Sequence, residues 1–314
     1  MDAPSVPAVR SFDYAPPLFH ASPQIAAMKN HSLVPAHLLA ALLLLCAPLS
    51  HAQVRVTAID EALSTMTETP AGDTLLEGSH VIVAPAGGQG KLFGTIGMVG
   101  GALGALLGTA IDSAQAQSAA KESTRTVGDA LKLKWFNEMN AALNKLASDA
   151  PEKYKITVGT PEEPGAKLRV FARLAPQKTE GQFSASIGVK TRFNGPDEKE
   201  IRRDYAYPLF PNRALVGEGS LTSAGPTSLR ESSATAINRL APLIARDVSG
   251  ALQSVITAET LPPITLRLPN TEQPTKYFLV EETDDVYVVV PNFRDRPARF
   301  YWIMLDKAQV KKEG

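Results

Sequence analysis

The chain has 314 residues, of which 44% are hydrophobic and 20% are charged, a composition typical of one large or two small globular domains. Lysine plus arginine and aspartate plus glutamate each number 32, so no excess of positive charge indicates a nucleic-acid partner. Aromatic residues make up only 6% of the chain, which also argues against a surface that stacks on nucleic-acid bases.

Residues 28–52 have the three parts of a secretory signal peptide in the expected order. Lys29 supplies the positive charge, Leu38 to Cys46 forms the apolar run, and Ser50 and Ala52 are the small residues before a cleavage site. The apolar run is too short to span a bilayer. We therefore expect export and cleavage after Ala52.

Residues 1–27 are rich in proline and have no apolar period, and they precede the signal peptide. Because signal peptides stand at the N-terminus, we expect translation to begin at Met28 and the first 27 residues to be a mis-assigned extension. The alternative is a genuine disordered extension. Cys46 follows the bulky Leu45, which argues against lipidation, and its removal would leave the mature chain without a thiol.

Residues 53–92 form a short lead-in with two predicted strands. Val54 to Ile59 alternates in hydropathy, and His80 to Pro85 is a short apolar run typical of a buried strand. Between them, residues 61–78 are polar and are predicted to form a loop. The glycine-rich turn that follows lacks the hydroxyl residue of a phosphate-binding loop, because Leu92 follows Lys91.

Residues 93–111, from Phe93 to Ile111, are nineteen residues without a charge, and six of them are glycine. On a helix the glycines recur on one face and leave a stripe almost free of side chains, which lets a second helix approach closely in lipid. We expect this glycine zipper to insert in a membrane and to mediate self-association, so that the protein is a homo-oligomer. A tightly packed helix in a soluble protein and a flexible loop are the alternatives. The residues of the stripe are Gly97, Gly100, Gly101, Gly104 and Gly108.

Residues 112–260 are predicted to form an α/β domain that begins with a helix over 114–148. The strands expected next are 154–158, 168–174 and a long hairpin of 182–193 with 200–207, whose turn is the sequence Asn-Gly-Pro-Asp. Apolar residues at steps of three and four define the buried face of the helix: Leu131, Trp135, Met139, Leu143 and Leu146.

A second long helix is predicted from Pro226 onward. Ser228 and Glu231 have the spacing of a capping box, which marks the beginning of a helix. Pro242 lacks a backbone donor, so we expect it to kink or split this helix near Asn238.

Residues 261–314 are predicted to form a small antiparallel β domain after the break at Pro262-Pro263. Four short strands are expected, with turn residues between them. The predicted strands are 264–268, 277–281, 286–291 and 299–305.

Candidate catalytic residues are scarce in the mature chain, which has one histidine, His80, and no cysteine. A cysteine–histidine zinc site is therefore excluded, and His80 is more simply explained as a structural residue. We predict no catalytic, cofactor-binding or metal-binding residues. An acidic cluster lacks the alternation of a calcium loop and is interpreted as a solvated turn. Its members are Glu281, Glu282, Asp284 and Asp285.

One basic and aromatic patch on the long hairpin is a candidate contact for an anionic polymer or lipid. Charged residues on an edge strand more commonly serve only to prevent aggregation. The candidate residues are Lys199, Arg202, Arg203, Tyr205 and Tyr207.

The order of predicted elements over residues 80–257 resembles the sheet-and-helix domains of bacterial envelope lipoproteins. The curli secretion channel protein and the lipoprotein activators of penicillin-binding proteins are examples of these domains. Phe93 to Ile111 separately resembles the glycine-zipper segments of exported bacterial proteins. These resemblances imply an assembly or scaffolding role in the envelope, with no catalytic residues to transfer.

Together these features predict an α+β protein of the periplasm or cell envelope that is membrane-associated and not an enzyme. It would self-associate through the glycine zipper and present its α/β domain to other envelope proteins, with no cofactor and no nucleic acid. One alternative is a soluble periplasmic binding module in which the glycine stretch packs internally. A second alternative is an exported hydrolase.

The signal peptide generates the first testable prediction. N-terminal sequencing of the exported protein should begin at Gln53, because Ser50 and Ala52 provide the small residues that the cleavage site requires. A mature chain that still carried Ser50 to Ala52 would contradict this cleavage site. Equal export of a form translated from Met1 would contradict the proposed start at Met28.

Overall fold

The structure is a computed structural model, and one compact unit, His51–Gly314, contains all the residues that it describes. The signal peptide and the glycine zipper lie outside them. The described residues are 53–60, 74–75, 79–84, 128–177, 179, 181–194, 199–226, 228–257, 260–269, 271, 273–293, 296–297 and 299–313.

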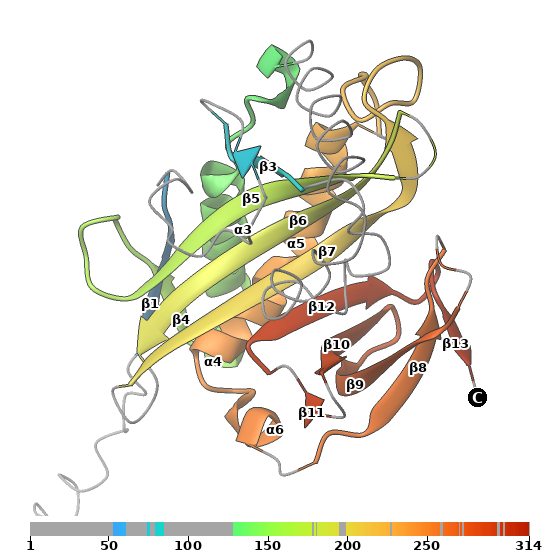
Figure 1. Cartoon of the computed structure of the whole chain (residues 1–314). Helices are drawn as coiled ribbons and strands as arrows, with labels where there is room; N and C mark the ends of the chain where they lie inside the picture. The colour runs from blue at the N-terminus through green and yellow to red at the C-terminus, as the bar shows by residue number, and fades with distance from the viewer. Residues whose placement is uncertain are drawn as a thin grey trace, which may run out of the picture. The chain divides into compact units, whose positions relative to one another are not determined.

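A large mixed sheet organises this unit (Figure 1). Its strand order is β13-β8-β9-β10-β12-β7-β6-β5-β1-β4, with β2 and β3 attached beside β5 and β11 beside β10. The strands are β1 Val54–Ala58, β2 Thr74–Leu75, β3 Val81–Val83, β4 Ile156–Val158, β5 Ala166–Pro176, β6 Gln182–Asn194, β7 Glu200–Ala214, β8 Pro263–Arg267, β9 Thr275–Glu282, β10 Val286–Phe293, β11 Arg296–Pro297, β12 Tyr301–Asp306 and β13 Lys311–Glu313.

Helices cover one face of the central strands β5, β6 and β7, and the longest two, α3 and α5, pack against each other (Figure 1). The core lies between this helical layer and the sheet, because alternate strand residues such as Leu168, Val170 and Ala172 point toward the helices. The helices are η2 Gly128–Leu131, α3 Phe136–Asp149, α4 Pro151–Tyr154, α5 Leu229–Val248 and α6 Gln253–Thr257.

The described residues confirm the predicted α+β class and the long hairpin. Strand β6 pairs antiparallel with β7 from Gln182 opposite Ala214 to Asn194 opposite Glu200. Alternation of apolar and polar residues along the two strands determines which face each side chain takes. Strand β7 extends beyond the predicted end at Tyr207.

Helix α5 begins as the capping box predicts, since the side chain of Ser228 accepts a hydrogen bond from the backbone N–H of Glu231 at 3.2 Å. The predicted split near Asn238 does not occur, because α5 continues through Pro242 to Val248. Buried residues on both sides of the proline hold the helix against the sheet, and tertiary packing of this kind offsets one lost backbone hydrogen bond.

The prediction of a continuous helix over 114–148 is wrong for residues 128–148, the part of this range that the structure describes. Residues 132–135 are not helical, and α3 begins only at Phe136. Leu131, Leu133 and Trp135 are buried while the lysines between them are exposed, which is the two-residue period of an extended segment. The alternation in Leu-Lys-Leu-Lys-Trp therefore determined the local structure, and the helical spacing from Trp135 to Leu146 applies only to α3.

The four C-terminal strands are found as predicted, but they continue the central sheet. Strand β12 pairs in parallel with β7, with Trp302 opposite Tyr205. The second group of buried apolar residues, centred on β8 to β12, includes Ala206 of β7. Separate folding of residues 261–314 remains a prediction, and β12 would have to leave β7 for the segment to exist alone.

Among the described helices, none combines the length and the apolar character that a membrane crossing requires.

Gly188 in the middle of β6 makes room for an aromatic side chain from the neighbouring strand. It lies opposite Phe171 of β5, and a Cβ atom at position 188 would lie 2.3 Å from the ring carbon Cζ of Phe171. The ring therefore occupies the space that a side chain on β6 would take. This arrangement stabilises a glycine within a strand by covering its backbone.

We predict that Gly188→Ala lowers the free energy of unfolding by about 1–3 kcal/mol, because the new methyl group displaces the ring of Phe171. In a Phe171→Ala background the same substitution should cost much less, since the clash is absent. Urea denaturation of the four proteins measures both values. Equal costs in the two backgrounds would show that the ring and the glycine are not coupled.

Candidate functional site

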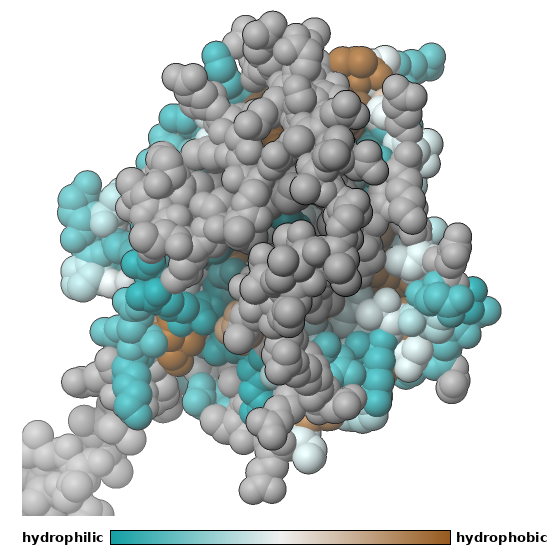
Figure 2. Space-filling model, in the orientation of Figure 1, coloured by the Kyte–Doolittle hydropathy of each residue, from teal (hydrophilic) through white to brown (hydrophobic). Residues whose placement is uncertain are grey.

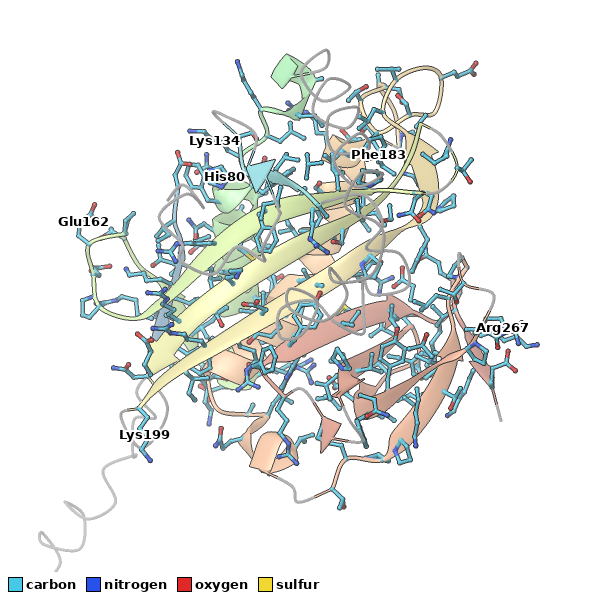
Figure 3. The ribbon with its side chains drawn as sticks, in the orientation of Figure 1. His80, Lys134, Glu162, Phe183, Lys199 and Arg267 are labelled. Carbon is cyan, nitrogen blue, oxygen red and sulfur yellow. The ribbon has the colours of Figure 1, made fainter. Side chains whose placement is uncertain are left out.

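His80, the one histidine of the predicted mature chain, is buried just before β3 and lies near Lys134 (Figure 3). Its Nε2 atom is 2.8 Å from Oδ1 of Asp60, and its Nδ1 atom is 3.2 Å from the carbonyl oxygen of Val170. Lys134 Nζ donates to Oδ2 of the same aspartate at 2.9 Å. This network joins the end of β1 to β5 and to the segment that precedes α3.

Within the described part of the chain, both ring nitrogens of His80 already have hydrogen-bond partners. Both ring nitrogens face an acceptor, so neither is available to accept a proton from a substrate. The hydrogen bond from Lys134 is the largest cause that lowers the pKa of Asp60, which keeps this carboxylate ionised. The geometry is that of a structural histidine.

A buried polar cluster joins β7, β12 and α5. The Nε atom of Arg203 lies 2.7 Å from Oδ2 of Asp247, and the two side chains are only 5% and 1% exposed. The N–H of Arg203 is not aligned on this oxygen, so the contact is an ion pair without a hydrogen bond at Nε. The hydroxyl of Tyr205 donates to the same carboxylate oxygen.

Trp302 of β12 completes the cluster. The guanidinium of Arg203 lies 4.8 Å from the centre of the Trp302 ring, and the Tyr205 ring meets it edge-on at 5.9 Å. Arg203 Nη1 and Trp302 Nε1 both donate to the carbonyl oxygen of Arg299, at 3.0 and 2.8 Å. A cation on an aromatic face is stabilised further when water is excluded.

Burial determines how the acidic members of the cluster titrate. Loss of hydration raises the pKa of Asp247, and the charge of Arg203 opposes this shift. Burial also raises the pKa of Tyr205 well above its ordinary value, with the charge of Asp247 as the second cause. Tyr205 therefore stays a hydrogen-bond donor, and Tyr205 and Asp247 are almost completely shielded from solvent.

The acidic turn after β9 forms ion pairs with other elements. Glu281 accepts two hydrogen bonds from Arg246 of α5, at 2.7 and 2.6 Å, and this pairing is the largest cause that raises the pKa of Arg246. Glu282 pairs with Lys307 at 2.8 Å, and Asp285 lies 3.3 Å from a nitrogen of Arg239. Glu282, Asp284 and Asp285 are exposed, as expected of a solvated turn, and Glu281 is half-buried in its ion pair.

The predicted basic and aromatic patch does not form one surface. Arg203, Tyr205 and Tyr207 point toward the helical layer and are buried, at 5%, 1% and 5% exposure. Arg202 points to the opposite face of the sheet, and Lys199 is exposed at the tip of the β6–β7 hairpin (Figure 3). Successive residues of a strand point to opposite faces, so neighbours in sequence cannot share one patch.

A groove on the face of the sheet opposite the helices is the principal candidate site. It has a volume of about 450 Å³ and lies at the end of the sheet between the loops that carry Glu162 and Lys199 (Figure 3). The described surface near the ends of β5 to β7 is predominantly hydrophilic in this view (Figure 2). Five cations line the groove: Lys167, Arg169, Lys190, Arg192 and Arg202.

Two carboxylates also line the groove, and both have basic partners. Glu200 lies 2.6 Å from Nε of Arg202, and Asp204 lies 3.6 Å from Nζ of Lys190. Lys167 instead donates to three backbone carbonyls of the loop before β5, those of residues 160, 161 and 163. The described lining therefore holds five positive and two negative side chains, a net charge of about +3.

The sequence contains a signal for this groove in the spacing of its basic residues. Lys167 and Arg169 stand two residues apart, as do Lys190 and Arg192, with buried residues between them. Each pair is therefore directed to the polar face of its own strand. Only the antiparallel register places the two pairs beside each other, with Lys167 opposite Arg192 and Arg169 opposite Lys190.

The predicted self-association residues lie outside the described part of the chain, so the structure does not place Gly97, Gly100, Gly101, Gly104 or Gly108. Within the described ranges, no three histidine, cysteine, aspartate or glutamate side chains gather as they would to hold a metal ion.

Comparisons of the chain with protein-family models, with curated proteins and with solved structures found no match.

The buried ion pair generates a prediction about stability. Asp247→Ala should lower the free energy of unfolding by about 3–5 kcal/mol, because Arg203 would remain buried without its counter-charge. Asp285→Ala removes a partner from the exposed pair with Arg239 and should cost less than about 1 kcal/mol. Urea denaturation at neutral pH gives both values. Similar costs for the two substitutions would mean that the buried pair does not hold the layers together.

Proposed function

We propose that the chain is an exported, membrane-associated protein of the bacterial cell envelope without enzymatic activity. In this proposal the protein self-associates through the glycine zipper, residues 93–111, and presents its α/β domain as an interaction domain. The observation that carries the proposal is the uncharged stretch with its repeated glycines, which follows an export signal in the sequence and lies between β3 and the remaining strands and helices.

The described structure supports an interaction role for the α/β domain. Helices cover one face of the central strands, and the opposite face carries the cationic groove. His80 and Asp247, the residues most suited to acid–base chemistry, have their polar atoms engaged within the protein. A binding function needs only the groove, whereas hydrolysis needs an accessible nucleophile or general base.

The runner-up is a soluble periplasmic binding module whose glycine stretch packs internally. The groove favours this candidate to the same degree, because a volume of about 450 Å³ is ordinary for a small-molecule site. The two candidates differ in where the protein resides after export. In the first, the mature protein should stay with the membrane fraction after a high-salt wash and require detergent for release.

The self-association half of the proposal predicts the effect of one substitution. Gly104→Leu places a bulky side chain in the glycine stripe, so chemical cross-linking in membranes should yield monomers in place of oligomers. Val99→Leu is the matched control, since it enlarges an apolar residue outside the stripe and should leave the oligomers intact. Oligomers that survive Gly104→Leu would exclude the zipper, and release of the wild-type protein by salt alone would exclude membrane insertion.

A further inference from the structure

We propose that His80 is held as a positively charged imidazolium whose proton fastens the short strands β1 and β3 to β5. Loss of that proton loosens this edge of the sheet, so the joint is a pH-sensitive device within the fold. The inference concerns described residues only, and it stands whether or not residues 93–111 enter a membrane. It goes beyond the proposed function because it assigns a response to pH to the α/β domain.

The first argument is the position of His80 between two strands that share one edge of β5. Strand β1 pairs in parallel with residues 166–168 of β5, and β3 pairs in parallel with residues 172–174. The described register of neither strand includes residues 169–171. His80 directly precedes β3, so its side chain lies where the two strands meet.

The carbonyl group of Val170 faces this gap. Carbonyls at alternate positions of a strand point to the same side, and those two residues before and after Val170 accept the backbone N–H groups of Ile59 and Ala84, at 2.9 and 2.8 Å. The carbonyl oxygen of Val170 lies 3.2 Å from Nδ1 of His80. The imidazole therefore supplies the donor that a backbone N–H supplies at the positions on either side.

The second argument is the number of protons that the contacts of the ring require. A neutral imidazole has one N–H donor and one acceptor nitrogen. Nδ1 faces a carbonyl, which only accepts, and Nε2 lies 2.8 Å from Oδ1 of Asp60. The hydrogen bond from Lys134 is the largest cause that lowers the pKa of Asp60, so this carboxylate is ionised and also only accepts. Both contacts are hydrogen bonds at the same time only when the ring carries two protons.

The charges around the ring in the described part of the chain agree with this count (Figure 3). Asp60 comes from the end of β1, and Lys134, from the segment before α3, binds the other oxygen of that carboxylate at 2.9 Å. Strand β5 presents the Val170 carbonyl, while its cations that line the groove point to the opposite face. Asn140 of α3 is neutral and binds the backbone of β1. The charge in contact with the buried ring is therefore negative.

Loss of the proton breaks one of the two contacts. If Nδ1 keeps its hydrogen, the lone pair of Nε2 faces the Asp60 carboxylate, and if Nε2 keeps it, the lone pair of Nδ1 faces the Val170 carbonyl. Because Lys134 keeps Asp60 ionised, the carboxylate does not supply the missing proton. The attachment is thus complete in acid and weakens as the pH rises through the range in which histidine titrates.

The experiment uses the full mature chain in detergent, labelled with ¹⁵N and purified without a histidine tag, so that His80 is its one histidine. The nitrogen chemical shifts of the imidazole report whether each ring nitrogen carries a proton. Hydrogen exchange at Ala84 N–H reports the attachment of β3, and exchange at Leu279 N–H, which bonds to the Pro262 carbonyl in the C-terminal strands, is the internal reference.

The variant is Asp60→Asn, whose side-chain amide can donate to Nε2 and so satisfies a neutral ring. Asp285→Asn is the matched control, since it makes the same change in the exposed pair with Arg239. Exchange is measured at about pH 6 and about pH 9, on either side of the range in which histidine titrates, and is corrected for the intrinsic exchange rate.

In wild-type protein at about pH 7, where an ordinary histidine is mainly neutral, we expect both ring nitrogens to carry a proton. Protection of Ala84 relative to Leu279 should fall about tenfold or more from the lower to the higher pH, the effect of losing one hydrogen bond to a charged group. Asp285→Asn should behave as wild type does. Asp60→Asn should show one ring nitrogen without a proton at about pH 7 and no such fall in protection.

The inference is overturned if one ring nitrogen of the wild-type protein lacks a proton at about pH 7. It is also overturned if Ala84 protection does not fall, or falls equally in Asp60→Asn. Should Asp60→Asn fail to fold, the nitrogen shifts and the exchange of the wild-type protein still decide. None of these outcomes affects the cross-linking and salt-wash results, so failure here is distinguishable from failure of the proposed function.

Discussion

The structure depends on one buried ion pair, that between Arg203 of β7 and Asp247 of α5. A buried charge without its partner costs several kcal/mol, so the pair fixes the position of the helix on the sheet. Trp302 lies against the same guanidinium and brings β12, and with it the C-terminal strands, to the edge of β7. Three elements that are far apart in the chain, β7, α5 and β12, thus meet at one point.

This constraint also explains the placement of the groove. Because Arg203 points into the helical layer, its neighbours Arg202 and Asp204 point to the opposite face. The same alternation on β5 and β6 sends their cations to that face, where the antiparallel register aligns them. One side of the sheet is therefore committed to packing, and the other carries the charged side chains of the groove.

The two polar clusters illustrate how burial decides between chemistry and structure. Each cluster contains a pair of groups that catalytic sites also use. The first pair is His80 with Asp60, and the second is Asp247 with Tyr205. In each case the remaining polar atoms are engaged by a backbone carbonyl, a lysine or an arginine. Such saturation fixes the fold, whereas the described lining of the groove has more positive than negative side chains.

The sequence by itself determined the α+β class, the long hairpin, the capped start of α5 and the four main C-terminal strands, because each rests on local periodicity or turn chemistry. Only the tertiary structure decided that residues 132–135 are extended, that Pro242 lies within a continuous helix, and that β12 pairs with β7. The tertiary structure alone placed Arg203 in the buried layer between sheet and helices, and the cations of β5 and β6 beside each other. The reason is physical: a strand's pattern states which residues share a face, but the partner and register across strands depend on contacts distant in the chain.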